Sequence, residues 1–575
     1  MDMFSDGPGR AVTVAKPVAR GGRHALRRPQ RVRGWLIFTV CCAVAVAGIA
    51  LWIGPAPMMA PWDVFILLNE AYRMYLGQAP GAGFSNPIGP LAYGLTAIGM
   101  HLQQAPSLRA VVYGQVIFLV IASALAWVVA WRRLPAPYAA FLTVFVAVLS
   151  VADRPLGYAP SITTYAMLYN REGWLLYTPL LLLVLVPVRG GRAWKDAVTD
   201  GLALGLLLGL LFYDKITFFI AAVVAVGLGL LLGTLRRSPL LGAASLAGLV
   251  AVAGLMRLLL HVSTGGYISD LAQAAAVQLA STRSHMLAHT LAWISPVILL
   301  AALVIAWLVA SARRDGSQKA PLARLALAAA YVVGSSALLS AGDASERSDL
   351  PALVVIPLLF VLFLEPMLPR WAGGPAAGNE AAPRPRGEAL MLLAVAALLA
   401  GTTVPIAGQD ALALGKAASY RGYVARPPAS QAIDAGPYRD FVVPANSQWQ
   451  TAYRTAYMMP SMINDGLRLL RANVRPGQVV YALAGTNPFS FALSLPPGGC
   501  GPVWWDLDYD FDQQHHASAQ CALGDASWVI VPRMLPGQPA DTTVSLLLSI
   551  DSGYLSQHFR QVAETSDWIL LRRRA

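Results

Sequence analysis

Long apolar runs alternate with short polar stretches over the first 407 residues, and the polar content rises after them. A membrane-spanning helix needs about 20 predominantly apolar residues, because hydrocarbon offers no partner for loose backbone groups. The pattern therefore predicts eleven membrane-spanning helices. They cover residues 35–54, 110–131, 137–152, 173–188, 199–213, 216–235, 239–260, 291–311, 322–341, 350–369 and 388–407.

Two other apolar stretches, 62–76 and 89–104, lie between the first two predicted spans. Polar side chains such as Asp63 and Glu70 interrupt the helical pattern of the first stretch. The second could be a twelfth span, but counting it would turn the arginine-rich loops that follow outward, against the positive-inside rule. We therefore predict both as helices that lie on the outer membrane surface.

The composition changes near residue 408, where polar residues, prolines and aromatics become more frequent. Strand-like runs alternate there with helical patterns near 459–473 and 541–557. The sequence therefore predicts a small C-terminal α/β domain over 408–575. Its predicted strands are 478–484, 502–507, 527–532 and 568–572.

The composition is typical of a polytopic α-helical membrane protein, since 56% of the residues are apolar and 13% are charged, against about 25% charged in soluble domains. The net charge of +13 does not favour a nucleic-acid partner, because eight basic residues precede residue 34 and most others flank the apolar runs. No cleavable signal is evident at 35–54, which we interpret as the first span.

Lysine and arginine cluster before the first span and after every second one, for example at Arg132/Arg133 and Arg236/Arg237. Basic residues stay on the cytoplasmic side because moving them across the membrane is costly. We therefore predict a bacterial inner-membrane protein with a cytoplasmic tail over 1–34, a transmembrane domain over 35–407 and an extracytoplasmic C-terminal domain.

The four cysteines fall into two pairs. Cys41 and Cys42 are adjacent in the first span and fit plain apolar packing. Cys500 and Cys521 lie in the C-terminal domain, where an extracytoplasmic setting allows a disulfide. Two buried free thiols are the alternative, and we favour the disulfide.

The first outer loop carries the motifs Pro61-Trp62-Asp63 and Asn86-Pro87-Ile88-Gly89-Pro90-Leu91-Ala92-Tyr93. In these motifs the chain resembles the superfamily of multi-spanning membrane glycosyltransferases with the GT-C fold. The resemblance implies a GT-C-like fold, a polyprenyl-phosphate sugar as donor and Asp63 as catalytic base. The chain has one acid where many members have a pair, and Asn86-Pro87 where many have an acid or a histidine, so a divalent metal is left open and no other cofactor is expected.

The position of Asp63 also fits this chemistry on physical grounds. Glycosyl transfer to a hydroxyl needs a base within hydrogen-bond reach of the acceptor, and cationic or hydroxyl groups must meet the charge of the leaving phosphate. Asp63 follows the first predicted span by about nine residues, which puts it near the lipid headgroups, with Trp62 and Phe65 as anchors. The alternative is an aspartate that caps a surface helix, and we favour catalysis.

Three later outer loops carry polar residues that could contact the donor. Arg171 and Glu172 offer a phosphate contact and a second acid, or else an ion pair that closes the end of a span. Lys215 breaks the positive-inside rule beside Asp214, which indicates either neutralisation by Asp214 or contact with a lipid phosphate; we favour the contact. Arg347 could hold phosphate, or lie in a solvated loop of paired charges.

The predicted site therefore combines one catalytic residue with a set of donor- or substrate-binding residues. Asp63 is the predicted catalytic residue. The predicted binding residues are Glu70, Asn86, Tyr93, Asn170, Arg171, Glu172, Asp214, Lys215 and Arg347. Alternating aspartates at 506–512, followed by His515 and His516, could invite calcium. The spacing fits no EF-hand loop, so we favour a solvated acidic loop.

These observations predict an inverting glycosyltransferase of the inner membrane that moves a hexosyl or pentosyl group on the extracytoplasmic side. Its expected partners are a polyprenyl-phosphate sugar donor, an envelope glycan or glycolipid acceptor, and the lipid bilayer. Trp504, Trp505 and Tyr509 could stack on an acceptor sugar, although a role in the core is favoured. The main alternative is a transporter or flippase, but the ionisable residues gather at one membrane face and not at the midplane where carriers bind substrate. A non-enzymatic scaffold and a ligase acting on lipid-linked polysaccharide are further alternatives.

Overall fold

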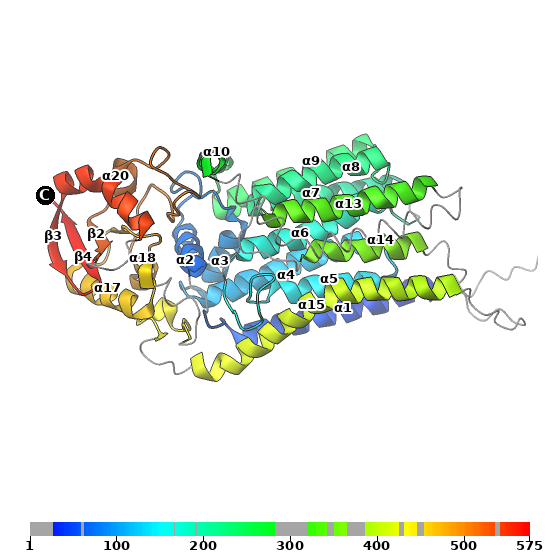
Figure 1. Cartoon of the computed structure of the whole chain (residues 1–575), viewed down its shortest axis with the longest axis horizontal. Helices are drawn as coiled ribbons and strands as arrows, with labels where there is room; N and C mark the ends of the chain where they lie inside the picture. The colour runs from blue at the N-terminus through cyan, green and yellow to red at the C-terminus, as the bar shows by residue number, and fades with distance from the viewer. Residues whose placement is uncertain are drawn as a thin grey trace, which may run out of the picture.

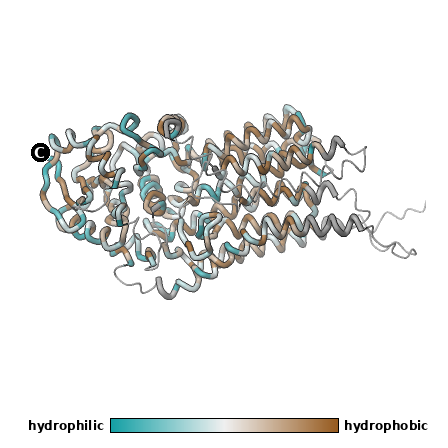
Figure 2. The backbone as a smooth tube through the Cα atoms, viewed as in Figure 1, coloured by the Kyte–Doolittle hydropathy of each residue, from teal (hydrophilic) through white to brown (hydrophobic). Residues whose placement is uncertain are grey.

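A computed structural model of the chain combines an elongated helical bundle with a small C-terminal domain at one end of it (Figure 1). Apolar residues dominate along the bundle helices, whereas the C-terminal domain mixes polar and apolar positions (Figure 2). The structure describes residues 27–58, 62–165, 167–189, 193–281, 319–341, 350–364, 386–424, 431–444, 454–534 and 541–575.

Ten of the eleven predicted spans coincide with helices, and the remaining one, 291–311, lies outside the described residues. Within the described part of the chain, six helical segments are long and apolar enough to cross a membrane. The bundle helices are α1 (Arg27–Ile53), α4 (Arg109–Ala130), α5 (Ala136–Ser150), α6 (Leu168–Leu185), α7 (Ala193–Asp214), α8 (Ile216–Leu232), α9 (Pro239–Leu260), α13 (Lys319–Ala341), α14 (Val355–Leu364, preceded by the 3₁₀ turn η2, Pro351–Val354) and α15 (Arg386–Val424).

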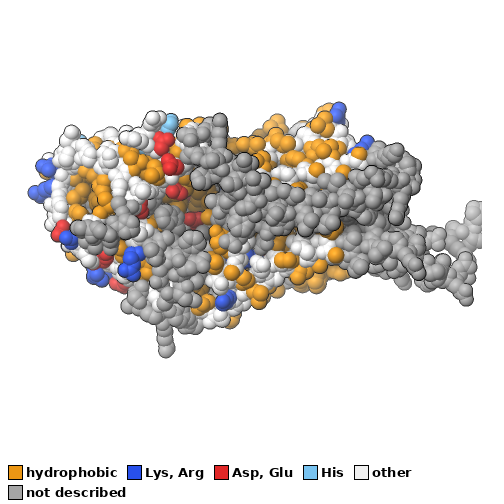
Figure 3. Space-filling view, viewed as in Figure 1, with side chains coloured by type: hydrophobic (Ala, Val, Ile, Leu, Met, Phe, Trp, Pro, Cys, Tyr) orange, Lys and Arg blue, Asp and Glu red, His pale blue; other side chains and the backbone are white. Residues whose placement is uncertain are grey.

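The outer surface of the bundle is apolar. Leucines on α8 and α9, such as Leu231 and Leu258, are 78% and 75% exposed, and hydrophobic side chains cover much of the described bundle surface in Figure 3. Exposed leucines in this number would be costly in water. The bundle is therefore embedded in lipid.

The predicted boundary at residue 408 falls inside α15, which continues to Val424. Pro405 lies within this helix and does not end it, because neighbouring elements and side chains can satisfy the backbone group that a proline leaves. The helix thus projects from the bundle toward the C-terminal domain (Figure 1).

Two helices, α2 (Trp62–Tyr75) and α3 (Pro90–Gln103), lie between the bundle and the C-terminal domain (Figure 1). Both were predicted as helices on the outer membrane surface. Most of their apolar side chains are buried in protein, for example Phe65 and Leu68 of α2 and Met100 of α3, whereas Leu102 of α3 is 62% exposed. A third helix of this region, α10 (Thr264–Ser281), lies beside the same junction.

The C-terminal domain contains a four-stranded mixed sheet with the strand order β1-β2-β4-β3. Strands β1 and β2 pair in parallel, and the other two pairs are antiparallel. The strands are β1 (Val480–Ala482), β2 (Trp528–Pro532), β3 (Phe559–Glu564) and β4 (Trp568–Arg573). The helices are α17 (Pro460–Asn473), α18 (Phe489–Leu493), α19 (Ala519–Leu523), α20 (Thr542–His558) and the 3₁₀ turn η4 (Gly436–Tyr438).

Three of the four predicted strands are confirmed, but the strand predicted at 502–507 is wrong and β3 was missed. The 502–507 segment does not join the sheet because its backbone bonds to two loops: Val503 donates to the carbonyl of Ser85, and Trp505 donates to that of Gly485. Trp504 and Trp505 are 5% and 3% exposed, so both belong to the core and are not open sugar-stacking platforms.

Candidate functional site

Asp63 lies in the first turn of α2 and is half-buried. Its Oδ2 accepts a hydrogen bond of 2.8 Å from the backbone N–H of Met167. Met167 has a positive φ of 58° and directly precedes α6, and a non-glycine residue in this region is uncommon. The backbone turn that starts α6 therefore holds the carboxylate of Asp63.

Lys215 reaches the same turn of α6 from the junction of α7 and α8. Its Nζ donates to Oδ1 of Asn170 at 2.6 Å and lies 5.2 Å from the centre of the Tyr169 ring. Asn170 is fully buried and follows Met167 by three residues. One turn of α6 thus contacts both the predicted base and the predicted phosphate-binding lysine.

The Gly89-Pro90 turn packs tightly against the end of α7. The N–H of Gly89 donates to the carbonyl of Asp214 at 3.1 Å. A Cβ at Gly89 would lie 2.2 Å from the carbonyl oxygens of Tyr213 and Asp214. Only glycine permits this approach, which fixes the start of α3 beside Lys215.

Tyr93, one turn into α3, lies close to the carboxylates of α2. Burial raises the pKa of its phenol well above the ordinary value, and the negative charges of Glu70 and Asp63 add to this effect. Tyr93 is 3% exposed. The phenol is therefore a neutral hydrogen-bonding group near Asp63.

Asn86 is the centre of a buried polar network that joins Glu70 to three other parts of the chain. Asn86 Nδ2 donates to Glu70 Oε2, the indole of Trp504 donates to Asn86 Oδ1 at 3.2 Å, and the backbone N–H of Asn86 donates to Asp270 Oδ2 at 3.0 Å. Burial raises the pKa of Glu70 well above its ordinary value. Its Oε1 has no hydrogen-bond partner among the described residues.

A second group of charged side chains surrounds the first turn of α6. Arg171 and Glu172 are 4% and 2% exposed. Asp153 lies opposite Arg171 and accepts a hydrogen bond of 3.0 Å from Gln115 Nε2. Burial raises the pKa of Asp153 to about 7, although the charge of Arg171 opposes the shift.

Asp214 lies beside Glu172 and completes this group. A Cβ at Gly173 would be 2.8 Å from Asp214 Oδ2, so α6 and the end of α7 are in direct contact. Within the described ranges, Glu172 Oε2 and both carboxylate oxygens of Asp214 have no hydrogen-bond partner. Buried polar atoms in this state are rare in folded proteins and indicate a place for a polar ligand or water.

The opposite end of α7 carries a different charge cluster. Asp200 is 2.7 Å from Arg132 Nη1 and 2.8 Å from Arg133 Nη2, and Arg132 also pairs with Asp196. Asp196 lies in the first turn of this 22-residue helix and Asp214 ends it. At 1.5 Å per residue the helix is roughly 33 Å long, which is about the thickness of a bilayer core.

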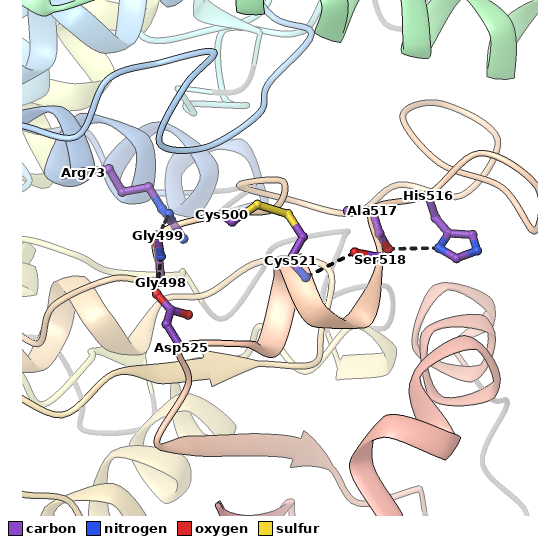
Figure 4. Close-up of a disulfide and its surroundings, with 9 residues drawn as sticks. All are labelled: Arg73, Gly498, Gly499, Cys500, His516, Ala517, Ser518, Cys521 and Asp525. Atoms are coloured by element: carbon purple, nitrogen blue, oxygen red, sulfur yellow. Dashed lines mark hydrogen bonds between the residues drawn. A yellow bond between two sulfur atoms is a disulfide. The ribbon is translucent and has the colours of Figure 1, made fainter. Parts of the chain in front are cut away.

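The C-terminal domain is anchored to α2 next to its disulfide. Cys500 and Cys521, the pair for which the sequence predicted a bridge, are bonded to each other. Arg73 at the end of α2 donates to the carbonyl of Gly498 at 2.7 Å, and Figure 4 shows this contact beside the disulfide. The backbone N–H of Ser85 donates to the carbonyl of Gly501 at 3.1 Å.

Most of the predicted site residues thus lie where α2, α3, the start of α6 and the end of α7 meet. Arg347 lies outside the described residues. The acidic loop at 506–512 folds on itself, since Asp510 accepts from the backbone of Asp506 and Asp512 pairs with His515. Among the described residues, no three His, Cys, Asp or Glu side chains are grouped closely enough to hold a metal ion.

Sequence reasoning missed several residues that surround the site. Gln115 and Asp270 are single polar positions without a local motif. Arg73 was not among the predicted site residues, yet it is 3% exposed and bonds to the C-terminal domain. A charged arginine among the apolar residues of α2 is the one signal in the sequence that could have revealed this contact.

No family model and no curated protein matches the chain. Its structure is similar to that of ArnT from Cupriavidus metallidurans bound to undecaprenyl phosphate, with 14% identity, a TM-score of 0.40, and coverage of 94% of this chain and 98% of that one. It is also similar to the oligosaccharyltransferase AglB from Archaeoglobus fulgidus in complex with an inhibitory peptide and a dolichol-phosphate, with 11% identity, a TM-score of 0.29, and coverage of 92% and 74%.

Proposed function

We propose that the chain is a GT-C-type membrane glycosyltransferase that moves a sugar from a polyprenyl phosphate to an envelope glycan or glycolipid. One observation carries the proposal: the carboxylate of Asp63 and the ammonium of Lys215 contact the same turn of α6, through Met167 and Asn170. A half-buried carboxylate beside a cation is what transfer from a lipid phosphate to a hydroxyl requires.

In the proposed reaction, Asp63 takes the proton of an acceptor hydroxyl while that oxygen attacks the anomeric carbon. The bond between this carbon and the phosphate oxygen breaks, and polyprenyl phosphate leaves with the electron pair. Lys215 and Arg171 meet the negative charge that grows on the phosphate. A single displacement of this kind inverts the anomeric carbon.

Glu70 and Tyr93 would bind the sugar. Glu70 with its raised pKa and the neutral phenol of Tyr93 can donate hydrogen bonds to sugar oxygens. Asn86 holds Glu70 in place and also contacts Trp504 of the C-terminal domain. The acceptor would therefore meet the donor where this domain covers α2 and α3.

The charge distribution supports a reaction on the extracytoplasmic side. Asp196, which pairs with Arg132, and Asp214 are about 27 Å apart along α7, which is close to the thickness of a bilayer core. Arginine-rich ends stay in the cytoplasm, so Asp63 and the C-terminal domain would face the other side of an inner membrane.

The test is to profile lipid-linked sugars and envelope glycans by mass spectrometry in a deletion strain that carries one of three alleles. We expect the deletion and the Asp63→Asn allele to accumulate a lipid-linked sugar and to lack one envelope modification, and the wild type to restore it. Asp434→Asn is the matched control, because the side chain of Asp434 is 82% exposed in the C-terminal domain. Full restoration by Asp63→Asn would refute the proposed function.

A further inference from the structure

A short segment of the C-terminal region, residues 436–442, reaches the same helix that carries Asp63. Its aromatic side chains Tyr438 and Phe441 are 1% and 0% exposed. The Phe441 ring stacks on the Phe65 ring with centroids 5.3 Å apart, and the Tyr438 ring meets Phe65 edge-on at 5.8 Å. Phe65 lies two residues after Asp63 in the first turns of α2.

Backbone contacts fix this segment to the membrane domain on both sides of the stack. The N–H of Met58 donates to the carbonyl of Val442 at 2.7 Å, and the N–H of Leu108 donates to the carbonyl of Pro437 at 3.0 Å. Arg109 also pairs with Asp440 at 2.9 Å. The segment that contacts Phe65 is therefore itself bonded to the loop after α1 and to the start of α4.

The orientation of α2 decides where the carboxylate of Asp63 lies. Rotation or sliding of this helix would move Asp63 away from the N–H of Met167, which it contacts at 2.8 Å. A base displaced by about 1 Å can lose on the order of 100-fold in rate. A stacked aromatic pair resists such motion, because it packs best in offset or edge-on geometries.

We propose that Phe441, together with Tyr438, is a positioning residue for Asp63 that acts through Phe65. This inference rests on the proposed function and adds to it that the C-terminal domain is part of the catalytic machinery, beyond any role in holding the acceptor. It assigns to the aromatic cluster an effect on turnover and not on donor binding.

The experiment compares Phe441→Leu, Phe65→Leu and the double variant in the purified full-length protein. The substrate is membrane from the deletion strain, which retains both unspent donor and unmodified acceptor, and the readout is the polyprenyl phosphate released. Leucine keeps most of the apolar side chain, and the midpoint of thermal unfolding of each variant checks that it is folded. Phe511→Leu is the matched control, since Phe511 is 1% exposed and pairs with Trp505 at 4.9 Å in the second core of the same domain.

We expect each single variant to lower kcat about tenfold or more with KM within about twofold. The double variant should lose no more than either single variant, because both remove the same contact. Phe511→Leu should keep its kcat. The inference is overturned if Phe441→Leu keeps full kcat, if the two losses multiply, or if Phe511→Leu loses as much.

Failure of this inference is distinguishable from failure of the proposed function. If Asp63→Asn is inactive in the same assay while Phe441→Leu matches the wild type, only the positioning role is wrong. If Asp63→Asn matches the wild type, the assignment of the base is wrong and the proposed function falls with it.

Discussion

Replacing Gly89 with alanine should push the start of α3 away from the end of α7 in the candidate site. Gly89 starts α3, which carries Tyr93, and it packs against the end of α7, which precedes Lys215. The added methyl would lie 2.2 Å from the carbonyl oxygens of Tyr213 and Asp214. Because these oxygens belong to the backbone of a helix end, they cannot rotate out of the way.

The size of the effect follows from this geometry. Ordinary contact begins at 3.4 Å, so the start of α3 and the end of α7 must separate by about 1.2 Å. Overpacking of this kind costs about 1–3 kcal/mol in the free energy of unfolding, and the Gly89–Asp214 hydrogen bond would be strained as well. A shift of about 1 Å between reacting groups lowers turnover by about 100-fold.

The assay is the release of polyprenyl phosphate from deletion-strain membranes, together with the midpoint of thermal unfolding. Gly265→Ala is the matched control, because an alanine Cβ there would meet nothing within 4 Å. We expect Gly89→Ala to lose most of its turnover and Gly265→Ala to retain it. Full turnover in a folded Gly89→Ala protein would refute the claim that this contact sets the site.

Three further predictions concern stability. Replacing Cys500 and Cys521 by serine should destabilise the C-terminal domain by about 3 kcal/mol, the entropy of a loop of 21 residues; unfolding of the wild type with and without reductant checks this, and identical midpoints would contradict it. The ion pair of Arg154 and Asp410 is fully buried, with its atoms 2.6 Å apart. Asp410→Asn should therefore lower the free energy of unfolding by about 3–5 kcal/mol, whereas the double variant Arg154→Met/Asp410→Leu should recover most of the loss. Thermal unfolding of both variants tests this, and equal losses in the two would contradict it. Burial holds a proton on Asp153 up to about pH 7, whereas the unfolded chain releases it near pH 4. The stability of the wild type should therefore fall relative to that of Asp153→Asn as the pH rises from about 4 to 7, and then level off. Parallel profiles of stability against pH for the two proteins would show that Asp153 is not the group responsible.

The helices of the membrane domain could be predicted from the sequence because each requires its own run of apolar residues. The extent of α15 could not, since the helix continues to Val424 beyond the apolar span predicted at 388–407. The segment 502–507 has the aromatic and branched residues of a strand. Its backbone partner Ser85 lies more than 400 positions earlier, and no local pattern reveals such a contact.

Part of the candidate site could likewise be predicted from the sequence, and part could not. Lys215 could be predicted because an ionisable residue at its position in a membrane protein is costly and needs a reason. Asp63 could be predicted from the resemblance and from its place near the headgroups after the first span. Their link through Met167 and Asn170 depends on the left-handed turn before α6, which the sequence around Met167 does not signal. Asp270 joins the network only because α10 folds over the first loop, where its carboxylate accepts the backbone N–H of Asn86.

The central claim is that the cation beside Asp63 receives a lipid phosphate, and two lysines of the chain allow a matched test. Lys215 lies 5.2 Å from the Tyr169 ring at the candidate site, and Lys195 lies 5.4 Å from the Trp194 ring near the opposite end of α7. Native mass spectrometry of the purified protein with undecaprenyl phosphate should show a bound lipid in the wild type and in Lys195→Met, and about tenfold weaker binding in Lys215→Met, as expected when a charged contact of about 1.4 kcal/mol is lost. Equal binding by Lys215→Met and the wild type would contradict the account.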